Sequence, residues 1–284
     1  MNEAKGRTQA ALAALIGASF LGLSPIAIRV SEVGAQPTNF WRFAFALPIL
    51  GLWAILSRPK PSLGNIGWLL LAGVLFGIEV SLWGAAVTLT TVTNATLLAN
   101  LTPIFAAVFG WLLLRERLSA SILAGIGAAL TGAAILALAR AQGAVHRGEH
   151  GLLGDALGFS AAIGYAGYLL IVRAVGARVG VGGVMFWATL SAMIVSLSAS
   201  LVLREPLLAH TLPGWAMLVA LGVVVQVGGQ GFIAFGVGRL PIAISTVLLW
   251  MQPLVAAALS WVMFDEALSP LALGGAALIL AGIY

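Results

Sequence analysis

Residues 96–103 read TLLANLTP and residues 246–253 read TVLLWMQP, so a stretch that ends in proline recurs at an offset of 150 positions. The same offset aligns identical residues further along the chain, namely Trp111 with Trp261, Glu116 with Glu266, Gly125 with Gly275 and Gly132 with Gly282. Chance likeness between two apolar stretches does not keep Pro, Trp, Glu and Gly in register. The sequence therefore predicts that the chain consists of two related halves.

The composition places both halves in a membrane. Hydrophobic residues make up 61% of the 284 positions and charged residues only 8%, whereas about 25% charged residues are usual in soluble domains. A transmembrane helix needs about 20 apolar residues. Ten such stretches are found, at residues 10–30, 38–56, 66–87, 92–114, 120–139, 152–172, 181–203, 213–235, 241–264 and 270–284. We therefore predict an all-α integral membrane protein with ten transmembrane helices.

The two halves are predicted to insert with opposite orientations, because each contains an odd number of spans. We place the first five-helix repeat at residues 1–140, an extracytoplasmic connecting loop at 141–151 and the second, inverted repeat at 152–284. With the N-terminus in the cytoplasm, nine Lys and Arg residues fall in inner segments and four in outer segments. Cytoplasmic loops carry the excess of Lys and Arg, so both termini are expected on the cytoplasmic side of a bacterial inner membrane.

Each half has a fourth span with a proline, a glutamate after it and a Gly-rich fifth span. In these features the chain resembles the EamA domains of the drug/metabolite transporter superfamily over nearly its whole length, and it is most similar to bacterial exporters of the YddG type. The resemblance implies a secondary transporter that exports small metabolites, above all aromatic or other neutral amino acids, through a central cavity. Inverted repeats are typical of transporters whose substrate site lies at the repeat interface. The alternatives are a facilitator of other metabolites and an exchanger of nucleotide sugars or phosphate esters.

Two ionisable residues lie inside the predicted spans. Glu79 is in span three, roughly 12 Å below the outer surface. An intramembrane carboxylate must be paired, hydrated or protonated, so we expect Glu79 to face the protein interior, in an ion pair or in a substrate or proton role. Arg42 lies about four residues inside the outer end of span two. It either pairs with Glu79 and gates the outer side, or extends to the outer interface.

Further polar residues are predicted to line the cavity. Gln226 and Gln230 in span eight are four residues apart and share a helix face. Such a pair either bridges helices by hydrogen bonds or binds a carboxylate or ammonium group, and we predict the second. Tyr165 and Tyr168, in the middle of span six, are predicted to stack on a substrate side chain, with core packing as the alternative.

Pro103 and Pro253 occupy corresponding spans, and each removes a backbone hydrogen bond. Either polar side chains satisfy the freed carbonyl groups of a static kink, or the prolines are hinges that bend in turn; we predict hinges. Residues around the prolines are predicted to line the cavity: Asn94, Asn100 and Thr102 around the first, and Ser245, Trp250 and Gln252 around the second.

The sequence argues against other classes of function. No P-loop is present, so ATP is not the direct energy source. A membrane enzyme would need paired acidic residues or histidines within the spans, and His146 and His150 lack a third metal ligand. We predict no catalytic site, no cofactor, no metal and no nucleic-acid partner. The expected partners are the lipid bilayer and a small-molecule substrate, and a monomer is expected to form the complete pathway.

Overall fold

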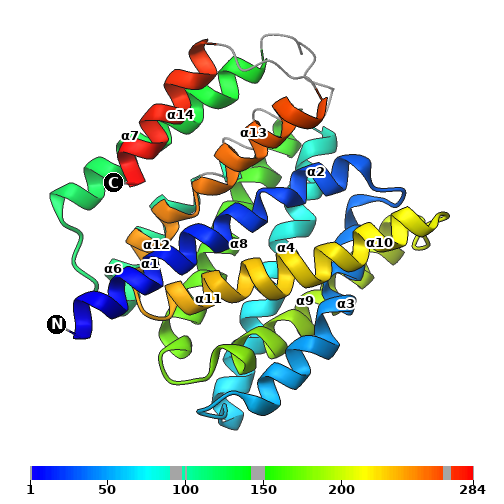
Figure 1. Cartoon of the computed structure of the whole chain (residues 1–284), viewed down its shortest axis with the longest axis horizontal. Coiled ribbons are helices and arrows are strands. Elements are labelled where there is room, and N and C mark those ends of the chain that lie inside the picture. The colour runs from blue at the N-terminus through cyan, green and yellow to red at the C-terminus, as the bar shows by residue number, and fades with distance from the viewer. Residues whose placement is uncertain (1, 90–97, 100, 142–150, 265–269, 284) are drawn as a thin grey trace.

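The chain is described by a computed structural model that covers residues 2–89, 98–99, 101–141, 151–264 and 270–283. All regular elements in these residues are helical (Figure 1). Seven helical stretches are long and apolar enough to cross a membrane, and three shorter apolar helices span residues 102–114, 120–132 and 273–282. Each stretch overlaps one of the predicted spans. The prediction of an all-α membrane protein with many spans is thus confirmed.

The elements follow one another along the chain as α1 (Asn2–Leu21), α2 (Leu23–Val30), α3 (Ala35–Leu56), α4 (Leu63–Leu89), α6 (Thr102–Leu114), α7 (Ala120–Ala141), α8 (Gly151–Gly176), α9 (Val181–Leu203), α10 (Leu212–Ala220), η1 (Leu221–Gln230), α11 (Gly231–Val237), α12 (Ile242–Leu248), α13 (Met251–Phe264) and α14 (Pro270–Ile283). The segment η1 is π-helical and continues α10 directly into α11, so these three elements share predicted span eight. Likewise, α12 and α13 share predicted span nine.

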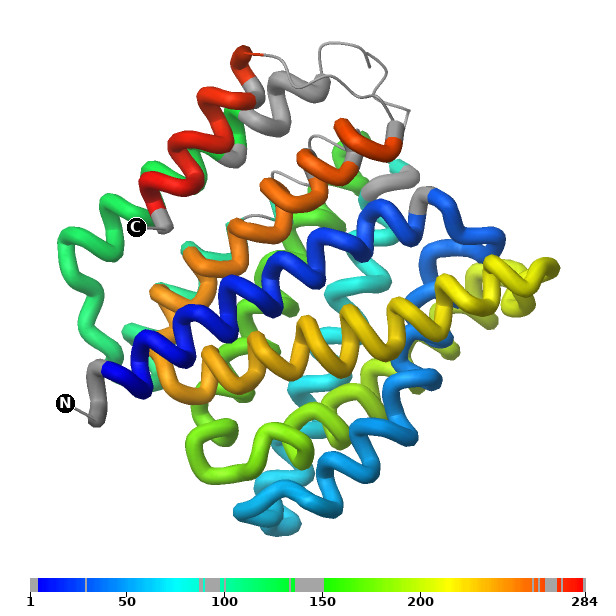
Figure 2. Tube along the Cα trace, in the orientation of Figure 1, coloured from blue at the N-terminus to red at the C-terminus, as the bar shows by residue number. Residues whose placement is uncertain are grey.

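The core of the bundle is centred on α3, α4, α8 and α9 (Figure 1). Helix α4 packs against both α8 and α9, α3 packs against α9 and η1, and α1 packs against η1 and α11. Helices α7 and α14 pack on each other at one edge of the molecule, and α12 and α13 lie between this pair and α1 (Figure 2). The apolar face of each central helix is therefore covered by helices from distant parts of the sequence.

Glycines allow two of these helix pairs to approach closely. A Cβ at Gly73 of α4 would overlap the carbonyl oxygen of Ala188 in α9, and one at Gly77 would lie 2.7 Å from Val195. The hydroxyl of Ser191 uses this proximity to donate a hydrogen bond to the carbonyl of Leu70 at 2.8 Å. Small residues at such positions are a common way to bring membrane helices into contact.

The second glycine contact joins α7 to α14. A Cβ at Gly125 would lie 2.8 Å from the carbonyl oxygen of Gly282, and a Cβ at Gly282 would lie 2.6 Å from the carbonyl oxygen of Gly125. A Cβ at Gly132 would lie 2.5 Å from the carbonyl oxygen of Gly275. Along α7, Gly125 and then Gly132 meet Gly282 and then Gly275 of α14, so the two helices run in opposite directions at this contact.

Pro103 and Pro253 lie near the beginnings of helices. Pro103 is the second residue of α6, and Pro253 is the third residue of α13. The hydroxyl of Thr102 donates a hydrogen bond to the carbonyl of Ala99 at 2.8 Å. The carbonyl of Leu249 accepts one at 3.0 Å from a backbone N–H three residues later. Both carbonyl groups that the prolines free are thus satisfied within the chain.

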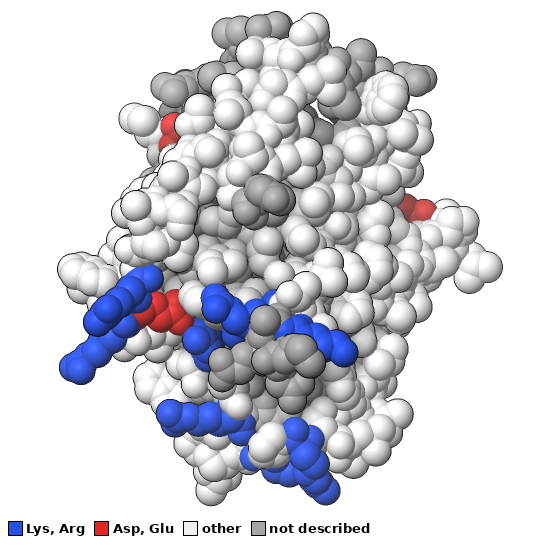
Figure 3. Space-filling model, turned by 60° about the vertical axis from the view of Figure 1, so that its left-hand side comes forward, with Lys and Arg blue, Asp and Glu red and all other residues white. Residues whose placement is uncertain are grey.

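Basic side chains gather at one end of the bundle, which we call the basic end. Helices α3, α8 and α11 end there, whereas α4, α7 and α9 begin there. Figure 3 shows Lys and Arg side chains close together on one face of the molecule. The exposed Lys and Arg side chains of the basic end include those of Arg58, Lys60, Arg115, Arg117, Arg178 and Arg239.

At the opposite end, two glutamates tie loops to the starts of helices. Glu32 accepts hydrogen bonds from the backbone N–H of His210 at 2.7 Å, from the backbone N–H of Thr211 at 3.0 Å and from the Thr211 hydroxyl. The Thr211 hydroxyl also caps the N-terminus of α10. Glu205 accepts a hydrogen bond from the backbone N–H of Gln36 at 3.0 Å, next to the start of α3. These contacts join the loop before α3 to the loop before α10.

We expect Gly73→Ala to destabilise the protein by about 1–3 kcal/mol, because the added methyl group forces α4 away from α9. Gly67→Ala, in the same helix, is the matched control, since a Cβ there meets nothing within 4 Å. Thermal unfolding of both variants in detergent measures the difference. Equal melting temperatures for the two variants would contradict the close packing of α4 on α9.

The contacts of Glu32 predict a pH-dependent stability. Hydrogen bonds donated to its carboxylate lower the pKa of Glu32. The bond from the Thr211 hydroxyl has the largest effect, and the bond from the His210 N–H has the next largest. A lowered pKa in the folded state stabilises the protein at neutral pH, and this stabilisation is lost as the pH falls through the lowered pKa. Glu32→Gln should therefore melt at a lower temperature than the wild type at pH 7, and the difference should shrink as the pH falls through the lowered pKa. A difference that persists unchanged in acid would refute this role of the carboxylate.

Candidate functional site

Arg42 is the centre of a buried polar cluster. Its side chain is only 5% exposed, because the inward face of α3 carries it together with Asn39 and Phe43. Its Nε donates a hydrogen bond to Oε1 of Gln226 at 3.0 Å, and its Nη1 donates one to Oγ of Ser24 at 3.4 Å. The guanidinium group is thus held between α2 and η1, and it does not extend to the outer interface.

Gln226 is itself held in place from the other side. Its Nε2 donates a hydrogen bond to Oγ1 of Thr189 in α9 at 2.9 Å. Gln226 and Thr189 are each 1% exposed. A continuous chain of hydrogen bonds therefore runs from α9 through η1 to α3, and it fixes the orientation of the guanidinium plane.

Aromatic rings surround the guanidinium group. Its central carbon lies 5.4 Å from the ring centroid of Phe43 and 5.8 Å from that of Phe76, which is within the range of a cation–π interaction. Phe76 stacks on Tyr168 with a centroid separation of 4.9 Å, and Tyr168 stacks on Tyr165 at 5.7 Å. Phe76 of α4 and Tyr165 and Tyr168 of α8 thus form a continuous aromatic wall.

Glu79 follows Phe76 by one helical turn and lies on the same side of α4. It interacts electrostatically with Arg42, Tyr165 and Tyr168. Its carboxylate does not come within 4.0 Å of the guanidinium group of Arg42, whose described partners are Gln226 and Ser24. The structure therefore places Glu79 near Arg42 without a direct ion pair.

Three buried polar atoms of the cluster have no hydrogen-bond partner among the described residues: Nη2 of Arg42, the hydroxyl of Tyr165 and Oε1 of Gln230. The side chains of Tyr165 and Gln230 neighbour each other without forming a bond of good geometry. Unpaired buried polar groups are rare in native proteins and indicate a water molecule, an ion or a ligand. Glu79 and Tyr165 as whole residues are less deeply buried than Arg42, Gln226 and Gln230.

The structure thus brings together Arg42, Glu79, Tyr165, Tyr168, Gln226 and Gln230. The other candidates lie elsewhere or are used locally. The Ser245 hydroxyl donates to the carbonyl of Pro241 at 3.2 Å, and Trp250 is 3% exposed at the break between α12 and α13. Thr102 bonds to Ala99, as described above, and Gln252 is half-buried in α13. Asn94 and Asn100 lie outside the described residues.

Sequence reasoning missed Ser24, Thr189 and Phe76. Phe76 is recognisable afterwards, because it is three residues from Glu79 and shares its helix face. Ser24 and Thr189 carry no such signal, since hydroxyl residues are common in membrane helices. Within the described part of the chain, no group of three His, Asp or Glu side chains comes together that could hold a metal ion.

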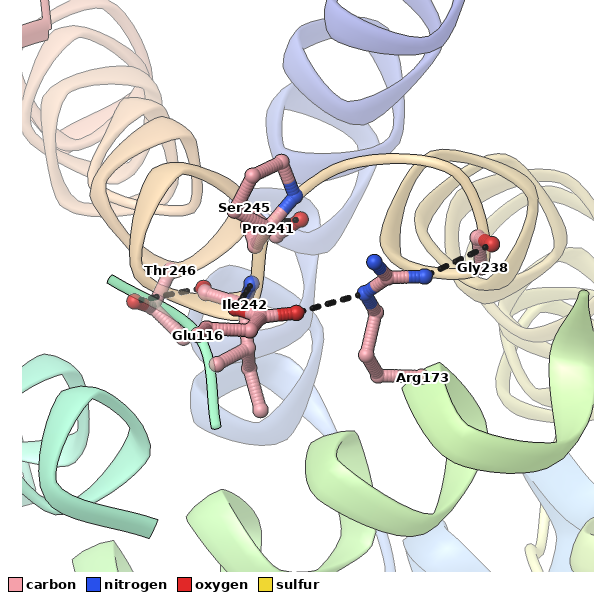
Figure 4. A network of polar contacts seen from close by, with 7 residues as sticks. All are labelled: Glu116, Arg173, Gly238, Pro241, Ile242, Ser245 and Thr246. Carbon is pink, nitrogen blue, oxygen red and sulfur yellow. Dashed lines mark hydrogen bonds and ion pairs between the residues drawn. The ribbon is translucent and has the colours of Figure 1, made fainter. Parts of the chain in front are cut away.

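A second network lies at the basic end (Figure 4). Glu116, just after α6, accepts a hydrogen bond from Nε of Arg173 at 2.9 Å through one oxygen and from the backbone N–H of Ile242 at 2.8 Å through the other. Nη1 of Arg173 also donates to the carbonyl of Gly238 at 3.3 Å. We call this network the Glu116 latch, because one carboxylate joins α6 to α8 and to the N-terminus of α12. The sequence had indicated Glu116 only as a repeated residue.

A bundle of broken membrane helices around a buried polar cluster is the architecture of a membrane transporter. Residues 8–138 and, separately, residues 152–284 match the model of the EamA-like transporter family, and the chain belongs to this family. Its membership in a transporter family agrees with a function other than catalysis.

Two known proteins are similar to the chain. A probable terminal-alkyne amino-acid exporter of Streptantibioticus cattleyicolor is 30% identical over 207 residues, which are 67% of this chain and 62% of the relative. The chain thus matches less than two thirds of the length of that exporter. A crystal structure of a protein with 24% sequence identity superposes with a TM-score of 0.79 and covers 98% of this chain and 96% of the other. It supports the overall fold.

Gln226→Leu is expected to destabilise the protein by about 2–4 kcal/mol, because it leaves the buried Nε of Arg42 and the hydroxyl of Thr189 without their partner. Gln226→Glu is the control, since a carboxylate still accepts from Nε of Arg42 and can accept from the Thr189 hydroxyl, which then donates instead of accepting. Thermal unfolding in detergent separates the two variants. If Gln226→Leu were as stable as Gln226→Glu, the hydrogen-bond chain would not hold Arg42 in place.

Proposed function

We propose that the protein is a secondary transporter that exports amino acids with aromatic or other neutral side chains by alternating access. The observation that carries this proposal is the buried cluster around Arg42, in which three polar atoms lack partners beside an aromatic wall. Such a cluster offers a polar ligand both charge and an apolar surface. The likeness to a probable amino-acid exporter points to the same class of substrate.

The proposed architecture is ten transmembrane helices in two inverted repeats, at residues 1–140 and 152–284, joined by the extracytoplasmic loop 141–151. Two observations support it. The family model matches the chain twice, once in each half. The glycine contacts between α7 and α14 pair Gly125 with Gly282 and Gly132 with Gly275, as a two-fold axis between repeated helices requires.

In this proposal the basic end faces the cytoplasm of a bacterial inner membrane, together with both termini, and a monomer is sufficient. The exposed Lys and Arg side chains of the basic end support this orientation. The Glu116 latch then closes the cytoplasmic side, because it holds α6 of the first repeat against α8 and α12 of the second. The helix breaks at Pro103 and Pro253 are the proposed hinges.

An exchanger of phosphate esters or nucleotide sugars is the second candidate, and the charges in the core argue against it. A phosphate ester carries a charge of about −1.5 to −2 near neutral pH, and the diphosphate of a nucleotide sugar carries one negative charge on each phosphate. Among the described residues, Arg42 is the Lys or Arg side chain that is buried, and it lies beside the carboxylate of Glu79. One cation beside a carboxylate suits a substrate without net charge better.

The transport function is tested by the uptake of labelled neutral amino acids into proteoliposomes, with and without an imposed pH gradient. We expect saturable uptake that competes with other neutral amino acids. Accumulation that follows the gradient and is lost in Glu79→Gln would make Glu79 the proton-coupling residue, whereas uptake independent of the gradient would indicate a facilitator. The absence of uptake for every amino acid in the panel would refute the proposed substrate class.

The Glu116 latch predicts a change in accessibility. Because the chain has no cysteine, a single Ser245→Cys substitution in α12 provides a label site without background. Adding Glu116→Gln leaves one acceptor for two donors, so the cytoplasmic side should open more often and label several-fold faster with a maleimide from that side. Arg117→Gln, at an exposed neighbour outside the latch, is the control. Equal labelling rates in the two backgrounds would rule out the latch as a cytoplasmic gate.

A further inference from the structure

We propose that Arg42 and Glu79 act as two separate poles that recognise the zwitterionic backbone of the substrate. Arg42 binds the carboxylate, and Glu79 binds the ammonium group together with acceptors on η1 and α8. This inference rests on the proposed transport of amino acids and names the chemical feature that the site selects. It explains why two opposite charges share a membrane core without pairing directly.

The carboxylate pole is the free edge of the Arg42 guanidinium group. Nε is occupied by Gln226 and Nη1 by Ser24, so Nη2 is the nitrogen that remains without a partner among the described residues. The group is held from behind by the hydrogen-bond chain to Thr189. A fixed guanidinium edge in a buried site forms strong, charge-assisted hydrogen bonds with a carboxylate.

The ammonium pole consists of hydrogen-bond acceptors. An ammonium group has three donors and no acceptor. Glu79 on α4 supplies a carboxylate, and the buried Oε1 of Gln230 on η1 is an acceptor without a partner. The Tyr165 hydroxyl, which neighbours Gln230 and interacts with Glu79, is a third oxygen. These oxygens come from three elements, α4, η1 and α8.

The balance of charge decides between zwitterions and simple ions. With Glu79 ionised, Arg42 and Glu79 together carry no net charge, so a zwitterion that binds between them pairs every charge. A carboxylate without an ammonium group would pair Arg42 and leave Glu79 unpaired, and an amine without a carboxylate would do the reverse. An unpaired buried charge is costly in a membrane core. The site should therefore reject both singly charged analogues of a substrate that it accepts.

The test uses the full-length protein in proteoliposomes and a labelled neutral amino acid that the wild type transports. Three unlabelled competitors are compared: the same amino acid, its N-acetyl derivative, which keeps only the carboxylate, and its amide, which keeps only the ammonium group. We expect each derivative to inhibit uptake about 10- to 100-fold more weakly than the amino acid itself, as the loss of one charge-assisted hydrogen bond predicts. Equal inhibition by the three compounds would overturn the inference and leave the transport function intact.

The variant Glu79→Gln reverses one part of this selectivity. Because the amide side chain carries no charge, the N-acetyl derivative no longer leaves a carboxylate unpaired, and its inhibition should approach that of the amino acid. Thr131→Val, which removes an exposed hydroxyl that bonds to its own helix, is the control and should keep the wild-type order. Stabilisation of the purified protein against heat by the same compounds gives a second readout that does not need transport.

Two further outcomes are decisive. If Glu79→Gln abolishes the response to a pH gradient while the order of the three competitors stays as in the wild type, Glu79 binds a proton and not the ammonium group, and the inference is wrong. If the wild type takes up no amino acid and none stabilises it against heat, the proposed function fails, and the inference fails with it.

Discussion

The arrangement of the core depends on keeping one guanidinium group ionised and hydrogen-bonded where no bulk water reaches. A buried charge is tolerated only when its donors find acceptors, and Gln226 and Ser24 meet this requirement for Arg42. The bond from Gln226 to Thr189 extends the same requirement to α9. Consequently α3, η1 and α9 must keep their relative positions, and the polar cluster inherits its geometry from them. A single side chain thus sets the register of three helices in the middle of the bundle.

Glycine contacts position α4, which the hydrogen-bond chain from Arg42 to Thr189 does not include. Lipid tails are as apolar as the side chains, so packing against lipid gains as much as packing against protein unless the backbones approach closely. Gly73 and Gly77 provide that approach between α4 and α9, and the same stretch of α4 carries Phe76 and Glu79 beside Arg42. The positions of the aromatic wall and of the carboxylate therefore follow from residues that carry no functional group.

Most of the architecture was predictable from two features of the sequence. Long apolar stretches indicate the membrane spans, and identical residues at a fixed offset indicate the repeat. The polar residues that gather in the core were predictable for a related reason: Glu79, Gln226 and Gln230 are costly in a membrane unless they face the interior. The hydrogen-bond partners of Arg42 were not predictable. Whether its long side chain reaches Glu79 or Gln226 depends on how each helix is rotated about its own axis. Ser245 shows the limit in the other direction, because a hydroxyl in a helix satisfies itself on the preceding turn and need not face a cavity.

The π-helical winding of η1 has a consequence for release of a ligand. A π-helical turn holds more residues than an α-helical turn, and such segments are frequent at functional sites. Gln226 and Gln230 both lie in this segment. Moving the wide turn along the helix by one residue would rotate one glutamine relative to the other by roughly 100°. Gln226 would keep its bond to Arg42 while Gln230 turned away from Tyr165. The amide oxygen of Gln230 would then leave the group of acceptors beside Tyr165, and no helix would have to tilt.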